Sequence, residues 1–172
     1  YKPEIFSYGH RSQQGLAFHP ITGDLWETEH GPQGGDELNI ITAGNNYGWP
    51  VIGLGVNYGI GNPIHESIIQ IGMEQPLHFW VPSIATSGLM VYTGDKFPEW
   101  HGDIFAGGLR GEQLAHIMLG DDNRTVIREE TLAYKVGRIR DVRQGPDGYI
   151  YISTEDRANA AETPIYRLEP VD

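Results

Sequence analysis

The segment GLAFHPITGDLWETE (residues 15–29) contains two short apolar runs separated by a turn with proline and glycine. Its second half, residues 23–29, alternates between two sets of side chains with the period of a β-strand. The same plan of strand, Gly/Pro/Asp turn and strand recurs in GLMVYTGDKFPEWHGDIFAGG (88–108) and in DVRQGPDGYIYISTED (141–156). The three segments begin 73 and then 53 positions apart, which indicates a weak internal repeat.

Antiparallel strands that repeat at about 40–50 residues are typical of a β-propeller. A sandwich or a simple meander is the alternative, because Asp-Gly hairpins occur in every all-β class. Helical periodicity is weak, and its best candidate, Glu66–Met73, is short and β-branched. The predicted strands lie within 15–20, 23–29, 88–94, 102–109, 114–119, 125–134, 138–144, 148–154 and 163–170.

The number of predicted strands bounds the size of the ring. A propeller has about 4–8 blades of four strands each, so these nine strands form two to three blades. Such a partial ring leaves blade faces unpaired. We therefore expect residues 1–172 to form one partial domain, about half of a propeller that another segment or chain completes. The opening residues Tyr1, Lys2 and Pro3 contain no initiator Met and no signal peptide, which favours a processed or partial chain.

Composition excludes several classes of function. The 172 residues include 12 Lys and Arg against 23 Asp and Glu, a net charge of −11. This charge argues against binding to nucleic acids and to anionic membranes. No apolar run is long enough for a transmembrane helix. The absence of cysteine excludes disulfides, thiolate zinc sites and a cysteine nucleophile. The sequence also lacks the G-x-S-x-G signature of a hydrolase.

The segment EHGPQGGDELNIITAGNNYGWP (29–50) combines acids with glycines that can turn backbone carbonyls inward. Calcium takes carboxylate and carbonyl oxygens as ligands, so this segment indicates a calcium site, although its spacing is not that of an EF-hand. A surface loop with solvated acids is the alternative. The carboxylates that it offers are Glu29, Asp36 and Glu37.

Arginines give a second indication of a ligand. Arg11, Arg110, Arg138 and Arg140 each lie near a glycine at a predicted strand end, and the last two share one face of a strand. In a propeller these ends converge on the central channel, where several guanidinium groups could bind a polycarboxylate. The alternative is local pairing, for example of Arg138 or Arg140 with Asp141.

Histidines offer no recognised catalytic or zinc spacing. His10 and His30 lie beside the two informative motifs, but neither is assigned as a catalytic base. The remaining five are predicted to lie in turns or on the surface: His19, His65, His78, His101 and His116.

Four stretches together resemble a known family. They are GHRSQQGLAF (9–18), the segment 29–50, GLRG (108–111) and GRIRDVRQGPDGYIYISTED (137–156). They are similar, in the same order, to the soluble quinoprotein glucose/sorbosone dehydrogenases, and most closely to the aldose sugar dehydrogenases that depend on pyrroloquinoline quinone (PQQ). The resemblance implies a six-bladed β-propeller of which this chain is the C-terminal half, with PQQ and Ca²⁺ over its central channel.

The resemblance also implies site residues. Glu37 corresponds to a calcium ligand through its carboxylate and Tyr47 through its carbonyl, with Gly31 and Pro32 as further backbone-carbonyl ligands. The family has Asn and Pro where this chain has Ser12 and Gln13. The residues that correspond to cofactor-binding positions are Arg11, Ser12, Tyr58, Leu109, Arg110, Gly111, Arg138, Ile139 and Arg140.

The implied reaction is oxidation of an aldose sugar at its anomeric carbon to a lactone, with electrons passed through PQQ to an external acceptor. In the family the general-base His and the acids that contact the sugar lie in the N-terminal half. We therefore predict no catalytic base in this chain, no activity of the chain alone, and a periplasmic or secreted location. The alternatives are a non-catalytic propeller module that has lost the cofactor and a calcium-dependent lactonase-type propeller.

Overall fold

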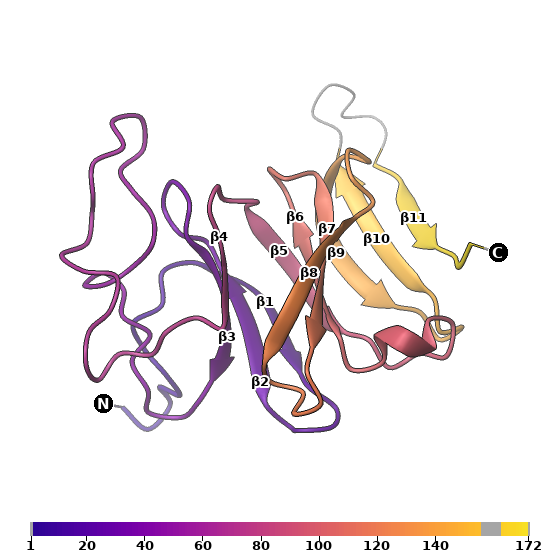
Figure 1. Cartoon of the computed structure of the whole chain (residues 1–172), viewed down its shortest axis with the longest axis horizontal. Helices are drawn as coiled ribbons and strands as arrows, with labels where there is room; N and C mark the ends of the chain where they lie inside the picture. Colours follow the sequence, from indigo (N-terminus) through magenta and orange to yellow (C-terminus); the bar gives the residue numbers. More distant parts are fainter. Residues whose placement is uncertain (1, 156–162, 172) are drawn as a thin grey trace.

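Three antiparallel sheets lie side by side in the computed structural model, which describes residues 2–155 and 163–171 (Figure 1). In each sheet, strands that follow one another along the chain are hydrogen-bonded neighbours. The first sheet contains β1 (Gln13–Phe18), β2 (Leu25–Glu29), β3 (Asp36–Ile41) and β4 (His78–Trp80).

The other two sheets repeat this meander, and a single turn of 3₁₀ helix, η1 (Pro98–Trp100), precedes β6. Among the described residues no helix is long and apolar enough to cross a bilayer. The second sheet contains β5 (Thr86–Val91), β6 (Ile104–Gly108), β7 (Gln113–Leu119) and β8 (Val126–Leu132), and the third contains β9 (Arg138–Gln144), β10 (Ile150–Glu155) and β11 (Ile165–Leu168).

The first strands of the three sheets lie next to one another. β1 packs against β5, and β5 packs against β9. Two side-chain bonds cross these contacts: Thr28 Oγ1 donates to the carbonyl of Ser87 at 3.3 Å, and Ser87 Oγ donates to that of Ile139 at 2.7 Å. In a propeller, the blades surround a central channel and their first strands lie next to one another. The three sheets have this arrangement.

The apolar core fills the spaces between sheets. Neighbouring residues of a strand point to opposite faces, so β6 of the middle sheet serves two interfaces. Ile104 packs with Trp26 of the first sheet, whereas Phe105 packs on the other side with Ile139 of the third. All five residues of β6 are buried, which explains its continuous small and apolar sequence.

The predicted all-β fold is confirmed, and the nine predicted strands correspond to observed ones with shifts of a few residues at their ends. Two strands were not predicted. β3 lies inside the Gly-rich acidic segment, and β4 has only three residues. The segment Glu66–Met73 is not helical but consists of turns and bends within the long β3–β4 connection.

Most of the cofactor-binding and calcium-binding residues predicted from the sequence lie at one end of the three sheets. Antiparallel pairing places the start of each first strand opposite the end of the second, as in the pairs Gln13 with Glu29 and Arg138 with Glu155. The start of β5 is likewise opposite the end of β6. We call this end, which carries the β2–β3 and β6–β7 turns, the upper end.

Candidate functional site

The glycine-rich turn between β2 and β3 depends on close backbone approaches. Gly34 and Gly35 have φ values of +84° and +72°, a conformation that side chains other than glycine rarely adopt. A Cβ on Gly31 would lie 2.2 Å from the carbonyl oxygen of Gly34. These contacts explain the glycines and bring several backbone carbonyls close together.

Asp36 fixes this turn to the next blade. Its side chain is fully buried and accepts bonds from the backbone N–H of Gly31 at 3.2 Å and of Ala85 at 2.7 Å, and from Ser83 Oγ at 2.7 Å. Because both carboxylate oxygens are engaged in this way, Asp36 is a structural acceptor. Of the three carboxylates in this segment, that of Asp36 is thus used to hold the β2–β3 turn against the next blade.

A small cavity of about 20 Å³ lies beneath the turn. This volume accommodates one water-sized particle or ion. All four residues assigned to calcium line it, and Arg11 lines it as well. Its walls are formed by Arg11, Glu29, His30, Gly31, Pro32, Gly35, Glu37, Tyr47, Trp49, Ile52, Gly53, Leu54 and His65.

Glu37 and Tyr47 contribute different atoms to this cavity. Burial, together with the charge of Glu29, raises the pKa of Glu37 to about 7. The Tyr47 hydroxyl donates to the carbonyl of Ile40 at 2.7 Å and accepts from the N–H of Thr42 at 2.8 Å. Burial also raises the pKa of that hydroxyl. Since the hydroxyl is engaged, the atom that Tyr47 could offer to a cation is its carbonyl oxygen.

Arg11 is held in place at the wall of this cavity. Its Nη1 donates to the carbonyl of His30 at 3.0 Å, and its guanidinium lies 5.2 Å from the centre of the Trp49 ring. The backbone N–H of Arg11 donates to Glu29 Oε2 at 2.6 Å, and that of Ser12 donates to the same oxygen at 3.3 Å. Arg11 Nε is buried without a hydrogen-bond partner among the described residues, so it can serve an added acceptor.

Arg138 and Arg140 lie together at the start of β9. Both reach Glu155 on the paired strand β10, and Arg138 Nη1 also donates to the carbonyl of Leu109 at 3.3 Å. The predicted alternative partner, Asp141, instead pairs with Arg143 at 3.1 Å. Ile139 lies between these two arginines in the chain and is fully buried in the core.

The β6–β7 turn carries the other predicted cofactor residues. The N–H groups of Arg110 and Gly111 both donate to the carbonyl of Ile84, and the N–H of Leu109 donates to that of Ala85. Arg110 is exposed. Hydrogen bonds from backbone and side chains therefore run from the Asp36 carboxylate through Ala85 and Leu109 to the Arg138 guanidinium, across all three blades at the upper end.

Tyr58 does not line the small cavity that the predicted calcium residues and Arg11 line. It is 68% exposed and lies in the β3–β4 connection. Its neighbour Gly59 donates its N–H to Gln33 Oε1 at 3.0 Å, which ties this part of the connection to the β2–β3 turn.

Two histidines contradict the surface prediction. His19 and His116 are fully buried. His19 Nε2 lies 3.0 Å from the carbonyl of Gly102, and His116 Nε2 lies 2.8 Å from Asp103 Oδ2. Both serve packing within and between the first two sheets, a role that neither turn composition nor spacing indicates.

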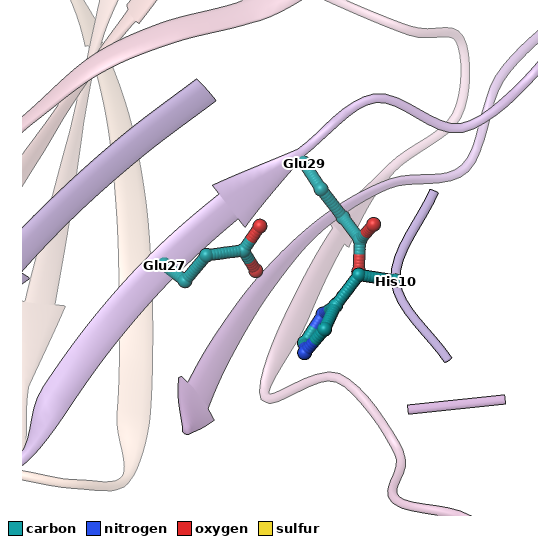
Figure 2. A group of neighbouring side chains, drawn as sticks. All are labelled: His10, Glu27 and Glu29. Carbon is teal, nitrogen blue, oxygen red and sulfur yellow. The ribbon is translucent and has the colours of Figure 1, made fainter. Parts of the chain in front are cut away.

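A buried group of titratable side chains was missed by the motif analysis. His10, Glu27 and Glu29 face one another on the side of the first sheet that points away from the second (Figure 2). Burial, together with the charges of Glu29 and Glu37, raises the pKa of Glu27 to about 9. The alternation of side chains along β2 could have indicated part of this group, because it places Glu27 and Glu29 on the same face of the strand as Leu25.

The propeller-type arrangement of the sheets allows the chain to be compared with known proteins, and the comparison identifies its family. The model of the Glucose / Sorbosone dehydrogenase family matches residues 1–166, and the chain belongs to this family. The aldose sugar dehydrogenase YliI of Escherichia coli is 44% identical over 156 residues, which are 90% of this chain and 42% of that protein.

Solved structures agree with the sequence comparison. A glucose dehydrogenase crystal structure matches with a TM-score of 0.89 and 44% identity, over 99% of this chain and 48% of that one. The PQQ-bound aldose sugar dehydrogenase from Streptomyces coelicolor matches with a TM-score of 0.71 and 29% identity, over 96% of this chain and 45% of that one. The predicted glucose dehydrogenase propeller fold is thereby confirmed. The chain spans about half the length of the relatives it matches, or somewhat less.

Proposed function

We propose that this chain supplies the PQQ and calcium seat of an aldose sugar dehydrogenase. The observation that carries the proposal is the upper end itself. There the small cavity, lined by Glu37, Tyr47, Gly31 and Pro32, lies beside Arg11, whose buried Nε has no hydrogen-bond partner among the described residues. The PQQ-bound relative and the family match support the choice of cofactor.

The residues fit a cofactor with several carboxylates. Arg11 is fixed by Trp49 and the His30 carbonyl, so its guanidinium is preorganised to receive a carboxylate. Arg138 and Arg140 present two more guanidinium groups from the third blade, and exposed Arg110 presents a fourth from the second. The backbone bonds of Leu109 and Gly111 hold the turn that carries Arg110, and buried Ile139 anchors the strand that carries the other two. The proposed contacts are completed by Ser12 and Tyr58.

The metal seat is proposed for the same cavity. Glu37 would bind Ca²⁺ through its carboxylate, and Tyr47, Gly31 and Pro32 through carbonyl oxygens, which are the ligands that this hard cation prefers. A bound cation would also hold Glu37 ionised despite its raised pKa. PQQ, when bound, supplies the two-electron oxidation of the aldose to its lactone and passes the electrons to an external acceptor.

We further propose that residues 1–172 are the C-terminal part of one propeller domain and that the general base lies in the other blades. The outer face of the first sheet supports this, since it exposes Leu16 and Phe18 of β1 by 59% and 71%. Ile165 of β11 on the third sheet is 70% exposed. Such apolar blade faces suit packing against further blades. We propose a periplasmic location on the basis of the family.

The test is dye reduction in the presence of an aldose. The chain alone, with PQQ and Ca²⁺, is expected to give no rate above that of free PQQ. Addition of a polypeptide that supplies the N-terminal blades should restore sugar-dependent reduction. Full activity of the isolated chain would contradict the placement of the base. A completed ring that binds PQQ but oxidises no aldose would favour the non-catalytic module instead.

A further inference from the structure

His10, Glu27 and Glu29 form a group of three potential metal ligands distinct from the proposed calcium seat. One ligand atom from each lies within 4.8 Å of the other two, and His10 Nδ1 is 3.4 Å from Glu29 Oε1. Figure 2 shows the Glu27 carboxylate, on β2, pointing toward Glu29 and the His10 ring. Donor atoms around an ion with bonds of about 2.1 Å lie at most about 4.2 Å apart, so small side-chain rotations suffice to close the group.

An unsatisfied buried oxygen points into this group. Glu27 is 1% exposed, and its Oε1 has no hydrogen-bond partner among the described residues. Its other oxygen accepts one long bond, of 3.4 Å, from Asn39 Nδ2. A buried carboxylate oxygen without a donor is costly, and a cation beside it removes that cost.

The other two ligands are already oriented. His10 Nε2 lies 2.8 Å from Ser7 Oγ, and the His10 ring stacks on Tyr47 with centroids 4.6 Å apart. An Nε2–H that donates to Ser7 leaves the Nδ1 lone pair on the side of Glu29, as in metal-binding histidines whose second nitrogen is held by a neighbour. Glu29 Oε2 is fixed by the N–H groups of Arg11 and Ser12, which leaves Oε1 for the cation.

From this geometry we infer that His10, Glu27 and Glu29 bind a divalent transition-metal cation, of the Zn²⁺ or Mn²⁺ type. The imidazole nitrogen selects against calcium and magnesium, which take oxygen ligands. In the 172-residue chain, a groove of about 460 Å³ on the outer face of the first sheet reaches His10 and Glu27 and gives the ion a path. The bound cation would hold the Arg11 segment to β2 through Glu29.

This site differs from the calcium seat in its ligands and its access. Glu29 borders both, but His10 and Glu27 line the groove, whereas Glu37 and Tyr47 line the small cavity. The inference therefore does not rest on the proposed dehydrogenase function.

Metal titration of the full chain tests the inference. The protein is first treated with EDTA to remove metal, and the EDTA is then removed. The metal-free protein is titrated with Zn²⁺ and with Mn²⁺ by calorimetry. We expect a site whose affinity falls at least tenfold in both His10→Gln and Glu27→Gln, and is retained in His101→Gln, which changes an exposed histidine. Far-UV circular dichroism verifies that each variant folds.

A spectroscopic readout keeps the inference falsifiable if a variant folds poorly. Mn²⁺ bound to wild type should show electron spin echo modulation from an imidazole nitrogen, and Ser7→Ala should weaken binding without removing a ligand. Wild-type binding without nitrogen modulation, binding that the His10 and Glu27 changes leave unaltered, or no binding at all would each overturn it.

Discussion

Asp36→Ala is expected to lower the free energy of unfolding by about 3 kcal/mol, because it removes the acceptor of one buried and one partly buried backbone N–H group. These groups belong to Gly31 in the β2–β3 turn and Ala85 before β5, and Ser83 Oγ loses the same acceptor. Ser83 Oγ also lies 3.0 Å from the N–H of Ala85, so part of the loss can be recovered. Urea unfolding followed by tryptophan fluorescence measures the change.

The exposed Asp121 provides the control, since Asp121→Ala should change the free energy of unfolding by less than about 0.5 kcal/mol. The Asp36 variant should also loosen the upper end, because Leu109 donates its N–H to the carbonyl of Ala85. Equal stability of the two variants would mean that the carboxylate does not join the first two blades.

Replacement of Glu27 by Gln is expected to remove most of the pH dependence of stability in metal-free protein. The folded protein holds a proton on Glu27 up to about pH 9, whereas the unfolded chain releases it near its ordinary value of 4.5. Between these values the folded state binds more protons, so stability falls as pH rises, by at most about 1.4 kcal/mol per pH unit. From pH 5 to pH 8 this amounts to about 4 kcal/mol.

Urea unfolding in EDTA at several pH values checks this expectation. Glu27→Gln should be more stable than wild type at pH 8 and should keep only a weaker slope below pH 7, which comes from the raised pKa of Glu37. The exposed Glu99, changed to Gln, should retain the wild-type slope. A wild-type stability that rises from pH 5 to pH 8 would show that Glu27 is ionised in the folded protein.

Sequence patterns predicted the strands whose hairpins have clear turn residues, such as β9 and β10 around residues 145–148. They did not predict β3, because its Asp and Asn residues are unfavourable in strands and are explained only by the contacts they make across the sheet. β4 has three residues, too few for a period-two pattern to be recognised. In both cases tertiary contacts outweigh local preference.

The sequence predicted only part of the candidate site, and the reason is similar. The glycines and arginines are recognisable from spacing and from the family resemblance, and the structure brings the four proposed calcium residues to one cavity. The role of Asp36 and the approach of His10 to Glu27 could not be predicted, because both depend on how separate strands and loops fold together. The Glu155 partner of Arg138 and Arg140 comes from pairing of β9 with β10.

A PQQ titration in the presence of Ca²⁺, followed by quinone absorbance, measures whether the arginines of the upper end seat PQQ. We expect saturable binding of one PQQ per chain, weakened at least tenfold by Arg11→Gln or by Arg138→Gln. Arg124, which pairs with Asp24 at the opposite end of the sheets, is the control, and Arg124→Gln should bind as wild type does. Absence of saturable binding, or equal weakening by all three substitutions, would contradict the account.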